Sequence, residues 1–220
     1  TPMQAPPLKY FKRGMTNVEL LAIMACLCLL AAIILPGLVK PSTRAPVTVC
    51  VNNLKQLALA QLNWADDHSA GSATTNFPAA NSEFQMNLTA ANLTTLYRSL
   101  SIELVNPRIL TCPADKRGTS ESFETLDTNS ISYFLNIDAS ISGNPEAALN
   151  GDRHLQSTPP RRTPFLTLRT NLDLGWDPTL LHKTIGNLSF VDGSVMKSSK
   201  REIKDYLGSP RTDGHRLLFP

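Results

Sequence analysis

The feature that most constrains this chain is a long apolar run near its start. Every residue from Leu20 to Leu35 is apolar, and further apolar residues follow soon after Pro36. Together with Val18, the run reaches roughly the 20 residues that a membrane-spanning helix needs. We therefore predict a transmembrane helix over residues 15–40. A secretory signal peptide, an ordinary membrane anchor and a lipoprotein signal carry similar runs, so the flanking residues must separate these classes.

One acidic residue separates them. Glu19 stands at the start of the run, and a charged side chain costs about 2.5–3.5 kcal/mol at the centre of a bilayer and less near its edge. None of the three classes needs a carboxylate there. The simple alternative is a Glu side chain that reaches back to the membrane surface. Lys9, Lys12 and Arg13 precede the run and are typical of a cytoplasmic flank.

Residues 12–19, Lys-Arg-Gly-Met-Thr-Asn-Val-Glu, resemble the processing motif of type IV prepilins and type II secretion pseudopilins. Counted from Met15, Glu19 is fifth and Pro36 is twenty-second, as in that family, although Met15 replaces the usual Phe. The resemblance implies that a prepilin peptidase cuts after Gly14, removes residues 1–14 as a leader and methylates the new terminus at Met15. It also implies that Glu19 pairs with the terminal amine of a neighbouring subunit in a filament, and that Pro36 kinks the filament-core helix.

Three later blocks extend the resemblance to a large group of prepilin-like proteins. They are a Cys-x-Asn-Asn-Leu-Lys-Gln segment from Cys50, a Cys-Pro-x-Asp segment from Cys112, and a Gly-Asn-x-x-Phe-x-Asp-Gly-x-Val segment over residues 186–195. Members of the group often have His where Ser194 stands. The middle of the chain matches only in scattered blocks.

The predicted fold is α+β and pilin-like: a long N-terminal helix packed on a small antiparallel sheet. Two prolines in residues 41–46 predict a break or hinge, because proline removes a backbone donor. From Val47 to Ala65 apolar residues return at helical spacing, which predicts an amphipathic helix within an extracytoplasmic domain over 47–220.

Weaker patterns predict the remaining elements. Helices are expected over 88–104 and 199–207, and a hairpin over 188–196 turning at Asp192-Gly193 in a type I′ turn. Loops are expected over 66–86 and 140–162, and a loosely held tail from Gly208. Strands are expected over 108–112, 130–136 and 164–169.

The four cysteines fall into two pairs. Cys26 and Cys28 lie in the apolar run, where cysteine packs as a small hydrophobe. Cys50 and Cys112 lie in the part predicted outside the cytoplasm, where disulfides persist. Either a Cys50–Cys112 bridge or two buried thiols fits the sequence. No cysteine spacing matches a zinc or redox pattern.

Charge and motifs exclude several functions. Of the 21 Lys and Arg, three precede residue 15, which leaves 18 against 18 Asp and Glu, so no basic nucleic-acid surface is expected. No catalytic motif is present, and no enzyme activity, cofactor or metal is expected. The run Asp66-Asp67-His68 is expected to be an exposed helix end and not a metal site, and a hairpin turn explains Asp192 without calcium. His154, His182 and His215 are predicted to be solvated.

The resemblance therefore implies a structural subunit of the bacterial inner membrane, crossing it once, with its domain outside the cytoplasm in a periplasmic or surface filament. Its partners would be the prepilin peptidase, other pilin-like subunits and the membrane. A pseudopilus of a type II-like secretion system is favoured over a minor type IV pilin. The alternatives are an anchored domain that binds a ligand or polysaccharide without polymerising, and an extracytoplasmic enzyme.

Overall fold

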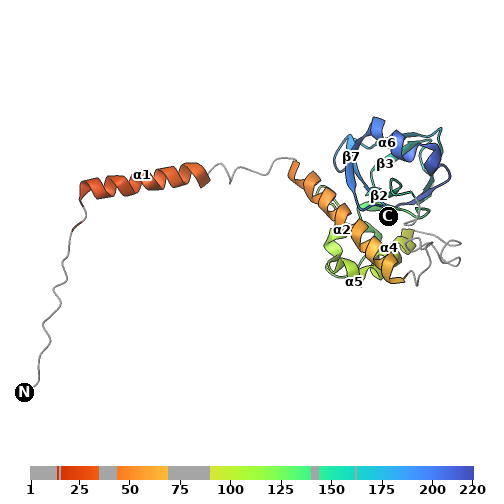
Figure 1. Cartoon of the computed structure of the whole chain (residues 1–220), viewed down its shortest axis with the longest axis horizontal. Helices are drawn as coiled ribbons and strands as arrows, with labels where there is room; N and C mark the ends of the chain where they lie inside the picture. Colours follow the sequence, from red (N-terminus) through yellow and green to blue (C-terminus); the bar gives the residue numbers. More distant parts are fainter. Residues whose placement is uncertain (1–13, 15, 35–43, 69–89, 140–143, 162) are drawn as a thin grey trace, which may run out of the picture. The chain divides into compact units, whose positions relative to one another are not determined.

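The computed structural model describes residues 14, 16–34, 44–68, 90–139, 144–161 and 163–220. The chain divides into two compact units, Thr1–Ser42 and Thr43–Pro220 (Figure 1). The first unit contains the helix α1 (Asn17–Ile34). The second unit holds all the other elements.

The second unit is α+β. Its α-helices are α2 (Arg44–His68), α4 (Ala90–Ser99), α5 (Ser101–Leu104) and α6 (Lys200–Leu207). Its 3-10 helices are η2 (Pro107–Leu110), η3 (Thr128–Ser130) and η4 (Pro210–Thr212). Its strands are β1 (Tyr133–Asn136), β2 (Ala148–Asp152), β3 (Leu155–Thr158), β4 (Phe165–Thr167), β5 (Asp173–Trp176), β6 (Ile185–Phe190), β7 (Val195–Ser199) and β8 (Arg216–Leu218).

The main sheet is antiparallel, with six strands in the order β4-β8-β1-β2-β6-β7, while β3 and β5 pair separately. Strand β8, which lies inside the sheet, comes from the segment that we predicted to be a loosely held tail. That prediction is wrong: Leu217 and Leu218 are fully buried, and Leu218 pairs with Leu135 of β1. The loop predicted over 140–162 is also wrong in part, because β2 and β3 lie within it.

Helices cover the two faces of this sheet. Side chains alternate along β1, so Tyr133 and Leu135 join one hydrophobic cluster while Phe134 joins the other. The first cluster contains the buried face of α2, and the second contains Ile203 and Leu207 of α6. The coarse prediction of a helix packed on an antiparallel sheet is therefore confirmed.

The buried face of α2 follows the predicted stripe. Leu54, Leu57 and Ala58 are completely buried, whereas Asn52 and Lys55 are exposed. Residues 44–46 of the segment that predicted a break belong to α2, which begins at Arg44. Pro46 lies in the first turn of the helix, where backbone N–H groups have no intrahelical acceptor and a missing donor costs little. The other proline of that segment lies outside the described residues.

The hairpin of β6 and β7 is confirmed, but its turn type is wrong. A type I′ turn needs positive φ at both central residues. Gly193 has a φ of +78°, whereas Asp192 is not among the described residues with positive φ. Hydrogen bonds from Gly193 N to Phe190 O (3.0 Å) and from Phe190 N to Ser194 O (2.9 Å) close a longer turn with glycine in the left-handed position.

Of the other local predictions, some are confirmed and one is wrong. Helix α6 begins after Ser199, whose N–H donates to Glu202 Oε2 (2.7 Å), and it confirms the final helix. The predicted helix over 88–104 appears as α4 and α5, with residues 88 and 89 outside the described ones. Strand β4 is confirmed and β1 covers half of its predicted span. The strand over 108–112 is wrong: Asn106 caps η2 and Pro107 opens it.

Candidate functional site

The predicted processing and assembly residues lie at the start of α1. Gly14 is exposed, and Glu19 lies in the first turn of the helix. Glu19 Oε2 accepts a hydrogen bond from Thr16 N (2.8 Å), and Thr16 Oγ1 accepts one from Glu19 N (3.3 Å). These reciprocal bonds form a capping box, so Glu19 has a local structural role in addition to the predicted one. Met15 and Pro36 lie outside the described residues.

The surface of α1 is apolar on all sides. Val18 is 78% exposed, Leu21 is 71% exposed, and the described side chains along the helix are all exposed. The free cysteines Cys26 and Cys28 are among them. A helix that is hydrophobic all round is stable only where other apolar matter covers it, either lipid or other helices. Glu19 is the only charged residue of the helix.

None of the helices within the described residues is long and apolar enough to cross a membrane. The predicted segment 15–40 extends past Ile34, where the described part of α1 ends.

A disulfide joins Cys50 of α2 to Cys112, which follows η2, with the Cα atoms 5.2 Å apart. The sequence left a bridge and two free thiols open, and the structure has the bridge. Both cysteines are completely buried. The bond therefore fixes α2 to a segment distant in sequence, beside the main sheet.

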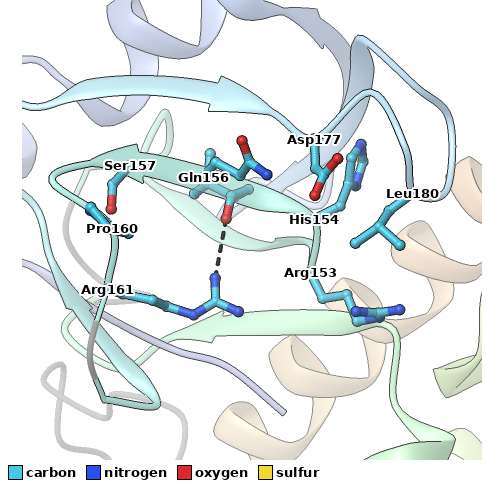
Figure 2. A pocket seen from close by; sticks show the side chains of 9 residues that line it. Arg153, His154, Gln156, Ser157, Pro160, Arg161, Asp177 and Leu180 are labelled. Carbon is cyan, nitrogen blue, oxygen red and sulfur yellow. Dashed lines mark hydrogen bonds between the residues drawn. The ribbon is translucent and has the colours of Figure 1, made fainter.

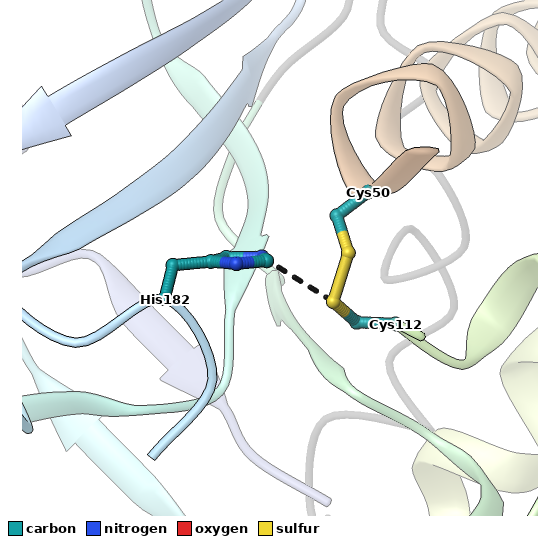
Figure 3. Close-up of side chains that lie close together, drawn as sticks. All are labelled: Cys50, Cys112 and His182. Carbon is teal, nitrogen blue, oxygen red and sulfur yellow. Dashed lines mark hydrogen bonds between the residues drawn. A yellow bond between two sulfur atoms is a disulfide. The ribbon is translucent and has the colours of Figure 1, made fainter. Parts of the chain in front are cut away.

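A histidine contacts this disulfide. His182 Nε2 lies 3.3 Å from Cys112 Sγ, and Figure 3 shows the imidazole directed at that sulfur. A disulfide sulfur carries no proton, so the imidazole N–H is the only donor that this contact can have. Asp152 Oδ2 lies 3.9 Å from the same nitrogen. Both neighbours face Nε2, unlike a catalytic triad, in which the acid and the nucleophile engage opposite ring nitrogens.

Asp152 is a charged side chain without solvent contact. Its Oδ2 accepts two hydrogen bonds from Asn187, one from the backbone N and one from Nδ2, both 2.8 Å long. Its Oδ1 is buried without a hydrogen-bond partner among the described residues. The bonds from Asn187 lower the pKa of Asp152, but desolvation of the carboxylate has the larger effect. The pKa is therefore raised from an ordinary 3.8 to about 7.

We name Cys50, Cys112, Asp152, His182 and Asn187 the His182 cluster. It lies between α2 and the sheet, and its two ionisable groups are shielded from water. Burial, followed by the positive charge of Lys197, lowers the pKa of His182, which keeps the ring neutral at pH 7.

The prediction that the three histidines are solvated is wrong for two of them. The side chain of His182 is only 2% exposed. His154 is also buried, and its ring packs on that of Trp176 with centroids 4.8 Å apart. Burial lowers the pKa of His154 to about 4. His215 immediately precedes β8 and contacts Asn136 through Nδ1 (3.2 Å).

The three sequence blocks that carry the family resemblance meet around the His182 cluster. In the first block, Asn53 Nδ2 donates to Thr111 O (3.2 Å). In the second, Asp115 accepts two bonds of 2.7 Å from Arg153. Desolvation of Asp115 raises its pKa, but these bonds and one from Ser132 outweigh it, so the pKa is lowered. The third block supplies Asn187.

A pocket of about 420 Å³ is lined in part by Arg153, the partner of Asp115, and by residues of β3 (Figure 2). Arg161 is held there, because its Nη1 donates to Leu155 O (3.1 Å) and its guanidinium lies 3.9 Å from the centre of the Phe219 ring. Asp177 lines the pocket opposite Arg161 and carries a carboxylate. The pocket offers a planar cation and an acid to a small polar ligand.

Comparison of the chain with protein-family models, with curated proteins and with solved structures finds no match.

Proposed function

We propose that this chain is a prepilin-like structural subunit, cut after Gly14 and assembled through α1 into a pseudopilus of a type II-like secretion system. The observation that carries the proposal is the exposed, all-apolar surface of α1, which follows Gly14 and contains Glu19 as its only charge. Such a helix needs a lipid or helical environment. A filament core of bundled helices supplies one, and the inner membrane supplies the other before assembly.

In this proposal the prepilin peptidase and neighbouring pilin-like subunits are the partners. Cleavage frees the amine of Met15, and the Glu19 carboxylate of one subunit pairs with the amine of the next. A buried charge is costly alone and tolerable when paired, so the pair would select the correct register between subunits. The disulfide favours a domain outside the cytoplasm, in keeping with the compartments in which such bonds persist.

The first test is the intact mass and N-terminal sequence of the chain recovered from membranes that contain its own prepilin peptidase. We expect a chain that begins at N-methylated Met15. A Gly14→Val variant should keep residues 1–14, because the added side chain occupies the position before the cut. A wild-type chain that still carries those residues would remove the processing step and favour an uncut anchor.

The role of Glu19 in assembly can be separated from its capping role. Glu19→Gln keeps an oxygen that can accept from Thr16 N but loses the charge, whereas Thr16→Ala keeps the charge and loses half of the capping box. We expect Glu19→Gln to lower the sedimentable filament fraction tenfold or more, and Thr16→Ala to leave it nearly unchanged. The measurement is immunoblotting of sheared filaments. Equal loss in both variants would assign Glu19 to helix capping alone.

The pocket beside Arg161 favours a second function, an anchored domain that binds an extracytoplasmic ligand without polymerising. Its volume of about 420 Å³ suits a small polar molecule or one unit of a polysaccharide. The two functions differ in the experiments above, because an anchor that never polymerises tolerates the loss of the Glu19 charge and stays uncut.

A further inference from the structure

His182 is held in place by unusual backbone. The residues on either side of it, Leu181 and Lys183, have φ angles of 39° and 65°. Positive φ is uncommon outside glycine and costs free energy, and such residues gather at sites where a side chain must be positioned. A solvated loop histidine would not require it. The loop before β6 therefore places the imidazole between the sulfurs and Asp152 at an energetic cost.

Three potential ligand atoms for a metal ion lie close together at His182. The sulfurs of Cys50 and Cys112 and a ring nitrogen of His182 all lie within 4.8 Å of one another. Ligand atoms of a tetrahedral zinc lie roughly 3.3–3.8 Å apart, as follows from Zn–S and Zn–N bonds of about 2.3 and 2.0 Å. The Cα separation of 5.2 Å allows the two sulfurs to reach that spacing by rotating about their Cα–Cβ bonds once they are not bonded to each other.

A fourth ligand is available in the same cluster. Asp152 Oδ2 lies 3.9 Å from His182 Nε2, and the buried Oδ1 has no hydrogen-bond partner among the described residues. An uncompensated carboxylate oxygen in the interior is unfavourable, and a bound cation is one of the few partners that removes the penalty. A cavity of about 540 Å³, lined in part by Pro46, Ala114 and His182, lies next to the cluster.

We propose that the reduced chain binds one thiophilic divalent ion, zinc in the first place, through Cys50, Cys112, His182 and Asp152, and that the metal and the disulfide are alternative occupants of the same place. The proposal departs from the absence of a metal site expected from the sequence. It does not depend on filament assembly, because all four ligands lie in the unit Thr43–Pro220.

Conversion of the disulfide-bonded state to the zinc-bound state needs two electrons, and a dithiol can supply them. Two electrons from the dithiol break the Sγ–Sγ bond, its two protons pass to the sulfurs of Cys50 and Cys112, and the dithiol becomes a cyclic disulfide. Zinc then binds both sulfurs as thiolates and displaces their two protons to solvent. Either cross-link joins α2 to the segment after η2 and to the sheet. The docking of α2 would thus be maintained in a reducing compartment as well as in an oxidising one.

The test uses the full chain in detergent micelles, with Cys26→Ser and Cys28→Ser as the background, because these free thiols would bind zinc themselves. The protein is reduced with a dithiol in dilute urea, freed of reductant under argon and titrated with zinc. Bound metal is measured per chain, and cobalt replaces zinc for absorption spectroscopy. We expect one zinc per reduced chain, none in the oxidised chain, and the thiolate-to-cobalt and d–d bands of a tetrahedral site.

Variants show whether the four residues act together. His182→Ala should weaken zinc binding tenfold or more, while His68→Ala, an exposed histidine at the end of α2, should leave it unchanged. If the reduced chain unfolds without metal, zinc should restore the native circular dichroism. The proposal is overturned if the reduced chain binds no more zinc than the Cys50→Ser, Cys112→Ser chain, if His182→Ala binds as tightly as its parent, or if zinc fails to refold an unfolded reduced chain.

Discussion

Removing the disulfide by Cys50→Ala and Cys112→Ala is expected to lower the free energy of unfolding of the globular unit by about 4 kcal/mol. The bond closes a loop with a sequence separation of 62, and the loss of loop-closure entropy in the unfolded chain gives about that value. Alanine leaves no buried hydroxyl without a partner. The removal of two buried sulfur atoms adds a smaller packing loss of the same sign.

Urea unfolding of the full chain in detergent, followed by circular dichroism with a metal chelator present, measures this loss. The matched control is the Cys26→Ser, Cys28→Ser chain, which should unfold near the wild-type midpoint because both side chains are free and exposed. Treatment of the wild type with a dithiol should reproduce most of the effect. An unchanged midpoint for the double alanine chain would mean that the bridge does not form.

Replacing Asp152 by Asn is expected to change the pH dependence of stability by a comparable amount. The pKa of this carboxyl is about 7 in the fold and 3.8 without burial. Between these values the folded chain binds a proton that the unfolded chain has released. The contribution of Asp152 is therefore fully present below about pH 4 and is lost as the pH rises to about 7. Three pKa units correspond to about 4 kcal/mol.

His154 acts in the opposite direction over nearly the same range. Burial lowers its pKa to about 4 from 6.5, so its contribution is present above pH 6.5 and is lost as the pH falls towards 4. The two groups largely offset each other in the wild type. In Asp152→Asn the contribution of His154 is no longer offset, and the lowered pKa of His182 acts in the same direction, so the stability of the variant should increase with pH. Relative to wild type, the variant should gain about 4 kcal/mol between about pH 4 and pH 7.

Urea unfolding at about pH 4, 5.5 and 7, with the disulfide intact and a chelator present, tests this expectation. Asp205→Asn is the matched control, because this aspartate is exposed on α6, and its curve should run parallel to wild type. Parallel curves for Asp152→Asn as well would show that the buried carboxyl keeps an ordinary pKa.

The sequence predicts those parts of the fold that repeat along the chain. The stripe of α2 and the hairpin of β6 and β7 follow from local periodicity. Strand β8 could not be found in that way, because its three residues show no alternation and its burial comes from the neighbours β4 and β1. Ile109 and Leu110 favour a strand where the structure has η2, whereas Pro107 is a helix-start signal.

The candidate site also has one part that local sequence predicts and one part that depends on distant residues. Consecutive residues predict the start of α1, and the Thr-x-x-Glu pattern of residues 16–19 is a further signal of a capped helix start. The five residues of the His182 cluster come from α2, the segment after η2, β2, the loop before β6, and β6 itself. No spacing along the chain connects them. Only the antiparallel pairing of β2 with β6 brings Asp152 to Asn187 and so to His182.

The place of β8 in the sheet also bears on how the domain is made. Strand β1 has β2 on one side, and on the other it has only β8, which pairs Leu218 with Leu135. During translation one edge of β1 therefore stays unpaired until all the other strands have been synthesised. An open edge is a template for any extended segment nearby, including one from another copy of the chain. This edge of β1 is covered only when residues 216–218 have been added.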